Sequence, residues 1–415
     1  MEKSPNLSFK DSTGVAYVIS RILSFPFWGL FCLLPVILYK DLHATPFQVA
    51  TLAALKPVAA LLSPYWSQRV HAMRKRLIPN LILGNILKFL PFLFFPFVSN
   101  PWFYIFAVAF HMFLCRGTIP AWMEILKLKV SGPSRSKICA IGSTIDYLGV
   151  ALLPLIIGGV LDHVPESWRY LFPIGAFLGI LSTIPINRIK IEGAQREQAP
   201  QEKKIDHLIN PWRSGWKLLK TRVDFAKFQW GFFLGGAGLM IIQPVLPAYF
   251  SDVLSLSYSD VLTAIAALKG IGFALSSPMW VKFFNRSRIF ILCAFVTLAA
   301  AAFPLLLIFA HTSSSIIYIA YLGYGVMQGG SELSWKMSGP VFAGDKDSAP
   351  YTSVNILAVG VRGLIFPYLG SALFMQTGSP TAVLLAGMGL CLLATAFLSY
   401  YGRRHPVRLE TVGAR

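Results

Sequence analysis

The chain has 415 residues, of which 55% are apolar and 13% charged, and its formal net charge is +19. A typical soluble domain is about 45–50% apolar and about 25% charged. The composition therefore excludes an ordinary soluble enzyme, a disordered protein and a coiled coil. The apolar residues form long unbroken runs and not the short alternating strands of a membrane barrel, which predicts an all-α protein that crosses a membrane many times.

Twelve apolar runs approach the ~20 residues that one membrane crossing needs. In chain order, the predicted spans are 14–39, 46–64, 78–98, 102–124, 138–161, 170–187, 228–250, 257–280, 289–310, 316–338, 352–375 and 381–401. Only Ser99, Asn100 and Pro101 separate the third span from the fourth, and Asn-Pro favours a turn. No small-residue cleavage site follows the first run, so we expect it to be a retained helix and not a signal peptide.

The positive charges are distributed unevenly between the two sets of loops. Most of the 37 Lys and Arg residues lie before the first span, in 65–77, 125–137, 188–227 and 281–288, or in the C-terminal tail. The loops of the other set contain only Lys40 and Arg169. Because loops rich in Lys and Arg stay in the cytoplasm, both termini are predicted to be cytoplasmic. The basic charge then belongs to the membrane surface, and we expect no nucleic-acid partner.

The two halves of the chain resemble each other. The run Ala-Ala-Leu-Lys ends at Lys56 and again at Lys269, and Trp122 recurs as Trp335 at the same offset. A parallel repeat of this kind is a transporter architecture. We predict a six-helix bundle over 1–187, a basic cytoplasmic linker over 188–227, a second six-helix bundle over 228–401 and a cytoplasmic tail over 402–415. Within the linker, 211–221 is a candidate surface helix with two tryptophans on one side.

With twelve spans, a six-plus-six repeat, cytoplasmic termini and a long basic central loop, the chain resembles the major facilitator superfamily over nearly its whole length. The loop 63–76 has the basic residues of that family's signature between spans two and three, although Gln68 stands at the aspartate position and the glycines are missing. The resemblance implies a transporter whose fourth span lines the substrate cavity and whose fifth span packs against the eighth. It leaves the subfamily and the substrate open.

Four basic residues inside the spans are candidates for substrate binding. Lys56 and Lys269 lie about ten residues from the cytoplasmic ends of their helices, or ~15 Å deep, which is close to the middle of a ~30 Å hydrocarbon core. Arg116 and Arg362 are also well inside spans, and arginine binds carboxylates and phosphates with two parallel hydrogen bonds. The alternative is that each of the four neutralises a buried carboxylate. Because cations outnumber acids inside the spans, the balance favours an anionic ligand.

Asp146 and Glu332 are the acids well inside the spans, and each is a candidate for proton coupling because burial favours the protonated carboxyl. The alternatives are ion pairs. The resemblance would bring Asp146 towards Lys269, and the four-residue spacing of Glu332 and Lys336 suits a pair within one helix. Arg21 is expected to extend to the cytoplasmic surface.

Trp122 and Trp335 are candidates for stacking on a ring of the substrate, with packing as the alternative. The five cysteines are dispersed within apolar runs, so neither a disulfide framework nor a metal site is expected. The sequence contains no nucleotide-binding or hydrolase motif. We therefore expect neither an enzyme nor a cofactor.

The leading hypothesis is a secondary active transporter that moves a small organic anion or zwitterion by alternating access, driven by protons or by exchange. The alternative is a membrane receptor or scaffold with a transporter fold and no flux. Charged residues at mid-membrane argue against that alternative, because a scaffold gains nothing from their insertion cost. We expect a monomer in a lipid bilayer, specifically in a bacterial inner membrane, with protons as possible co-substrates.

Overall fold

The computed structural model describes residues 12–62, 65, 76–130, 132–189, 204–286, 289–344 and 347–404. Every regular element in these ranges is a helix. Most of the signature loop 63–76, the linker residues 190–203 and the end of the tail lie outside the described residues.

The helices divide into two compact units, and residues 35–61 group with the C-terminal half of the chain. The first unit contains α1 (Ser12–Phe31), α5 (Leu77–Phe89), η2 (Leu90–Phe97), α6 (Pro101–Lys129), α7 (Gly132–His163), α8 (Trp168–Leu181) and α9 (Thr183–Ile186). The domain boundaries that the sequence suggested remain a prediction.

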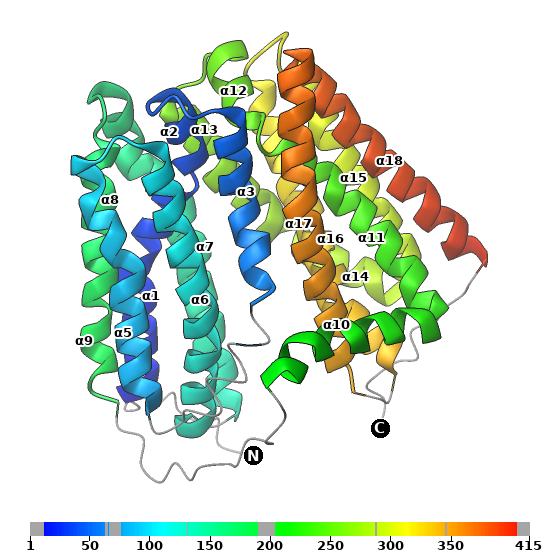
Figure 1. Ribbon diagram of the computed structural model, residues 1–415, viewed down its shortest axis with the longest axis horizontal. Helices are drawn as coiled ribbons and strands as arrows, with labels where there is room; N and C mark the ends of the chain where they lie inside the picture. The colour runs from blue at the N-terminus through cyan, green and yellow to red at the C-terminus, as the bar shows by residue number, and fades with distance from the viewer. Residues whose placement is uncertain are drawn as a thin grey trace, which may run out of the picture. The chain divides into compact units, whose positions relative to one another are not determined.

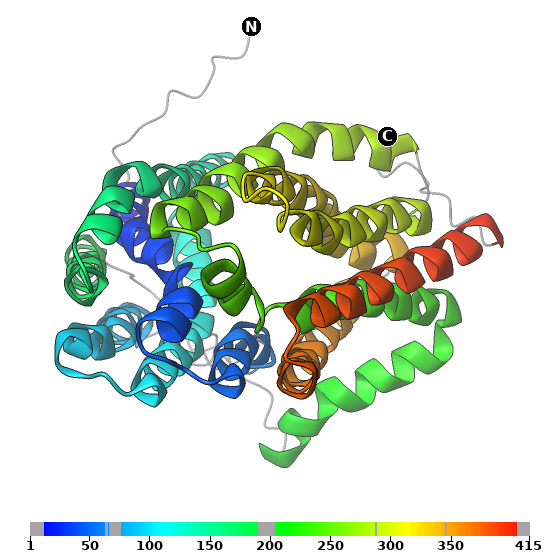
Figure 2. The same cartoon turned by 90° about the horizontal axis from the view of Figure 1, so that it is seen from above.

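The second unit begins with α2 (Leu34–Lys40) and α3 (Pro46–Ala60) and resumes at α10 (Lys204–Thr221). It continues with α11 (Val223–Ile242), α12 (Leu246–Ala248), η3 (Tyr249–Val253), α13 (Tyr258–Leu262), η4 (Thr263–Leu268), α14 (Lys269–Arg286), α15 (Ile289–Phe309), α16 (Ile316–Ala343), α17 (Ala349–Thr377) and α18 (Pro380–Arg404). Figure 2 shows α18, in red, alongside α11, and the two helices pack together.

Within the described ranges, ten helical segments are long and apolar enough to cross a membrane. Helices are also present at the two other predicted spans, where α3 covers most of 46–64 and α16 covers 316–338. The all-helical membrane fold is therefore confirmed, and the count of twelve crossings stays a prediction. The predicted break before α6 is present, because the Asn100 side chain caps that helix by accepting a hydrogen bond from the Trp102 amide at 2.9 Å.

Small residues allow α3 to pack closely along α17, as Figure 1 shows with α3 in blue and α17 in orange. A Cβ added at Gly363 would overlap the ring of Pro57, and one added at Gly360 would overlap the side chain of Leu61. Glycines permit this close approach because they have no side chain in the way. The packing attaches a helix from the first half of the sequence to the second unit.

Candidate functional site

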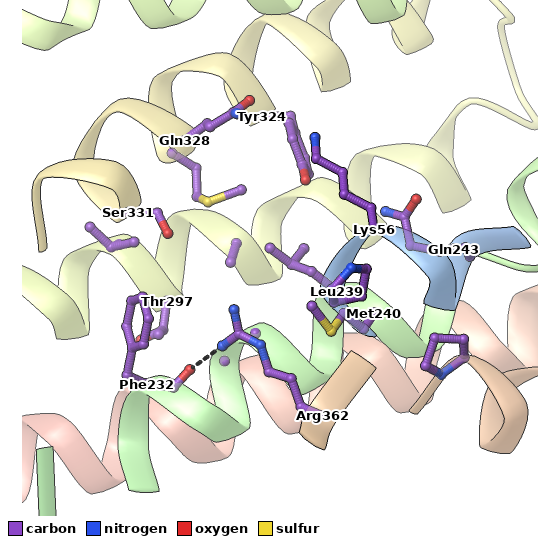
Figure 3. A pocket seen from close by; sticks show the side chains of 18 residues that line it. Lys56, Phe232, Leu239, Met240, Gln243, Thr297, Tyr324, Gln328, Ser331 and Arg362 are labelled. Atoms are coloured by element: carbon purple, nitrogen blue, oxygen red, sulfur yellow. Dashed lines mark hydrogen bonds between the residues drawn. The ribbon is translucent and has the colours of Figure 1, made fainter. Parts of the chain in front are cut away.

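A cavity of about 350 Å³ lies within the second unit, between α3, α11, α15, α16 and α17. Its apolar walls include Phe232, Leu239, Met240 and Met327. Its polar lining includes Lys56, Gln243, Thr297, Tyr324, Gln328, Ser331 and Arg362, which are labelled in Figure 3. Apolar walls with a few placed polar groups are typical of a pocket for a small molecule.

Arg362 enters this cavity from α17 and is held against α11. Its Nη1 donates a hydrogen bond of 3.0 Å to the backbone carbonyl of Phe232, and its Cζ lies 5.4 Å from the centre of the Phe232 ring. Its Nε is buried and has no hydrogen-bond partner in the described part of the chain. The guanidinium thus contacts a neutral carbonyl and an aromatic ring, and no carboxylate among the described residues forms an ion pair with it.

Gly236 makes room for that guanidinium. A Cβ built at Gly236 would lie 2.7 Å from Arg362 Nε and closer still to Nη1 and Cζ. Any side chain there would collide with the guanidinium. The glycine at this point of α11 therefore allows Arg362 to reach the cavity wall.

Lys56 reaches the same cavity from α3. The position of α3 is set by its contact with α17, where Pro57, the next residue after Lys56, fits against Gly363, the next residue after Arg362. One helix contact therefore brings two predicted cations to one cavity. None of the described residues that line it is Asp or Glu. Such a lining favours an anion, because its fixed charges are both positive.

The other predicted residues of the second unit lie elsewhere. Lys269 begins α14, where its backbone packs tightly against Gly325, and it is not among the described residues that line the cavity. The indole of Trp335 packs against an apolar cluster that includes Phe225 and Phe342. Lys269 and Trp335 remain predicted substrate-binding residues, but neither lines this cavity.

The ion pair predicted within α16 is confirmed, because Lys336 Nζ lies 2.6 Å from Glu332 Oε1. Its formation follows from the spacing of four residues along one helix face. Proton coupling through Glu332 stays a prediction.

In the first unit, Asp146 has a partner that the sequence did not suggest. Asp146 Oδ2 accepts a hydrogen bond of 3.1 Å from Arg21 Nη1, and its predicted approach to Lys269, which belongs to the second unit, stays a prediction. The pair with Arg21 forms because α1 and α7 pack side by side within the first unit. The side chains of Arg21 and Asp146 are 28% and 33% exposed, so the pair is half-buried, and the predicted extension of Arg21 to the cytoplasmic surface stays a prediction.

Two further predicted residues lie on α6. Trp122 is buried in an apolar cluster and packs edge-on against Tyr17, with ring centroids 5.1 Å apart. Tyr17 in turn lies under Arg21, whose Cζ is 4.8 Å from the ring centre. These contacts favour the packing alternative for Trp122. Arg116 is half-buried, and its role stays a prediction.

Sequence reasoning missed the neutral polar lining and one buried pair. Tyr324, Gln328 and Ser331 follow one another at spacings of four and three on α16, which places them on one face of that helix. This spacing was a usable signal. The buried pair is His111 and Lys88, in which His111 Nδ1 lies 3.0 Å from the carbonyl oxygen of Lys88. This contact depends on the packing of α5 against α6, and no spacing in the sequence indicates it.

Comparison with known proteins gives a family and a fold. A family model described as Major Facilitator Superfamily matches residues 17–337. No curated protein matches the sequence.

Several solved structures have the same fold at low sequence identity. A mutant of the nucleoside transporter NupG is similar with a TM-score of 0.76 and 15% identity, over 94% of this chain and 100% of that one. A POT family transporter in complex with a thioalcohol-conjugated peptide is similar with a TM-score of 0.74 and 14% identity, over 94% of this chain and 96% of that one. A POT family transporter in complex with 5-aminolevulinic acid is similar with a TM-score of 0.74 and 13% identity, over the same shares of the two chains.

Proposed function

The chain belongs to the major facilitator superfamily, a family of multi-pass membrane transporters, and on that premise we propose that its cargo is a small organic anion or zwitterion. Of these two classes we favour the anion. The observation that carries the proposal is the cavity of the second unit, into which Lys56 and Arg362 project and which no described carboxylate lines. A cargo with its own ammonium group would find no fixed negative partner among those lining residues.

The size and polarity of the cavity support a small cargo. A volume of about 350 Å³ falls at the lower end of the range for small-molecule pockets, ~300–1,000 Å³. Gln243, Gln328, Ser331 and Thr297 supply neutral hydrogen-bonding groups, which suit hydroxyl, carbonyl or amide groups on the cargo. The peptide conjugate and 5-aminolevulinic acid bound to the similar structures are also small polar organic molecules.

We further propose that transport is coupled to protons or to exchange, with Asp146 and Glu332 as the candidate acids. Each has a cation beside it, Arg21 and Lys336 respectively. Protonation of either acid would release its partner, which is the type of change that can couple proton binding to a conformational step. The proposal includes cytoplasmic termini, as the distribution of Lys and Arg predicts, together with twelve spans and a location in a bacterial inner membrane.

The test begins with a thermal-shift screen of the purified protein against anionic metabolites, zwitterions and cations. The compound with the largest shift is then used in counterflow with proteoliposomes. We expect an anion to be that compound. Arg362→Gln and Lys56→Gln should each weaken its binding by roughly 10- to 150-fold, because a hydrogen bond to a charged group contributes about 1.5–3 kcal/mol.

The matched control is Lys282→Gln. Lys282 is an exposed cation of α14 outside the described cavity lining, so its loss should leave binding unchanged. Selective binding of a cation would contradict the proposal. Specific anion binding without counterflow would favour the receptor or scaffold alternative.

A further inference from the structure

The helix α10 lies across the ends of α11 and α17, as Figure 1 shows. Arg222 alone separates it from α11, and that residue is fixed by hydrogen bonds of 2.9 Å to Asp224 Oδ2 and to the Tyr351 hydroxyl. Because α11 and α17 are long and apolar enough to cross the membrane, a helix transverse to their ends lies at the level of the membrane surface.

One side of α10 is fixed against the protein. Gly215 is buried, and a Cβ added there would lie 3.2 Å from Val354 Cγ2 of α17. Leu218 and Leu219 pack against the apolar cluster that includes Phe225. The rotation of the helix about its own axis is therefore set by the fold, and the direction of its remaining faces follows from it.

A second side of α10 presents large apolar side chains that the protein leaves uncovered. Ile209, Trp212 and Trp216 are 54%, 41% and 63% exposed. At ~100° per residue, these three positions fall in one sector next to the side that packs on the protein. Contiguous exposed apolar side chains of this kind mark a surface that binds something.

Basic residues form the next sector of the helix. Arg213, Lys217 and Lys220 are exposed, and their spacing of four and three residues places them in one row. Lys220 Nζ lies 5.3 Å from the centre of the Trp216 ring, so the cationic row borders the aromatic sector directly. Around the helix, the order is protein contact, tryptophans and cations.

We propose that α10 binds the anionic lipid headgroups of the membrane leaflet at this surface. Tryptophan favours the depth of the headgroups, and a row of Lys and Arg beside it is attracted to lipid phosphates. Both sectors are then satisfied by one occupant, with the indoles at the acyl boundary and the cations among the phosphates. The lipid contact would anchor the second unit where the linker enters it, and it does not depend on the identity of the cargo.

The experiment compares hydrogen exchange of the full-length protein in nanodiscs of phosphatidylcholine with and without phosphatidylglycerol. We expect the α10 amides to exchange more slowly with the anionic lipid, by about fivefold for each cation that contributes. Raising the salt concentration should remove this difference. A variant with Arg213→Gln, Lys217→Gln and Lys220→Gln should lose it while exchange in α11 and α17 is unchanged.

The matched control is the variant with Arg403→Gln and Arg404→Gln, which removes two exposed cations at the end of α18 and should leave the α10 effect intact. Equal α10 exchange in the two nanodiscs would overturn the proposal. A photo-crosslinker placed at position 216 provides a second measurement in cell membranes. Adducts with the mass of an anionic lipid support the proposal, whereas adducts with a protein would overturn it in favour of a protein partner.

Discussion

Replacement of Gly236 by alanine tests whether the position of Arg362 governs ligand binding. The added Cβ would lie 2.7 Å from Arg362 Nε, whereas ordinary van der Waals contact begins at 3.4 Å. The Nε must therefore move by about 0.7 Å, the difference between these two distances. Nη1 and Cζ are closer still and must move further, which breaks the 3.0 Å hydrogen bond to the Phe232 carbonyl.

The free energies predict a loss of binding that exceeds the loss of stability. Breaking a hydrogen bond to a charged group costs about 1.5–3 kcal/mol. Replacing glycine by alanine inside a helix returns about 1 kcal/mol, so unfolding should become easier by only about 0.5–2 kcal/mol. A cargo that loses its contact with the displaced guanidinium should bind roughly 10- to 150-fold more weakly.

The assay measures the dissociation constant of the anion selected in the thermal-shift screen, together with the melting temperature. Gly389→Ala is the matched control, because Gly389 lies inside α18 and an added Cβ meets nothing within 4 Å. It should keep full binding and match or exceed the wild-type stability. In an Arg362→Gln background, Gly236→Ala should have little further effect, since both changes act through one side chain. Wild-type affinity in the Gly236→Ala protein would refute the role assigned to Arg362.

Two other predictions concern coupling and topology. Asp146→Asn mimics the protonated acid and removes the counter-charge of Arg21, so it should preserve substrate-for-substrate exchange in proteoliposomes while it abolishes accumulation under an imposed pH gradient. Continued accumulation would exclude Asp146 as the coupling acid. A cysteine at Lys40 should react with an impermeant thiol reagent added outside the cell, and a cysteine at Lys203, outside the described residues, should not. Reversed labelling would overturn the predicted orientation.

The parts of the fold and site that were predictable from the sequence depend on local patterns. Apolar length located the membrane helices, and the four-residue spacing of Glu332 and Lys336 was sufficient to predict their ion pair. Arg362 was predictable as a candidate because a charge inside an apolar run is costly to insert, so it usually faces a cavity or an ionic partner. Each of these inferences requires knowledge of one helix only.

The remaining features depend on which helices pack together, and the sequence does not specify this. The Arg21–Asp146 pair follows from the contact of α1 with α7. Gly236 clears space for a guanidinium from another helix, which the sequence of α11 alone does not reveal. The role of Trp122 could not be predicted either. A tryptophan on a helix of this kind has the same sequence pattern whether it stacks on a ligand or packs against Tyr17.

The surroundings of Arg362 give a physical reason for anion selectivity. Its guanidinium contacts a carbonyl and a ring, both neutral, and its buried Nε has no hydrogen-bond partner among the described residues. Arg362 is half-buried, and a charge that is partly removed from water without an ionic partner is costly, because its desolvation penalty is not repaid. An anion that enters the cavity would supply the missing charge and accept the unused Nε hydrogen. The relief of this penalty would then contribute to binding, and it would be unavailable to a cationic molecule of the same size and shape. We infer that selectivity arises from the desolvation penalty of Arg362 before the cargo binds as much as from the contacts formed with the cargo.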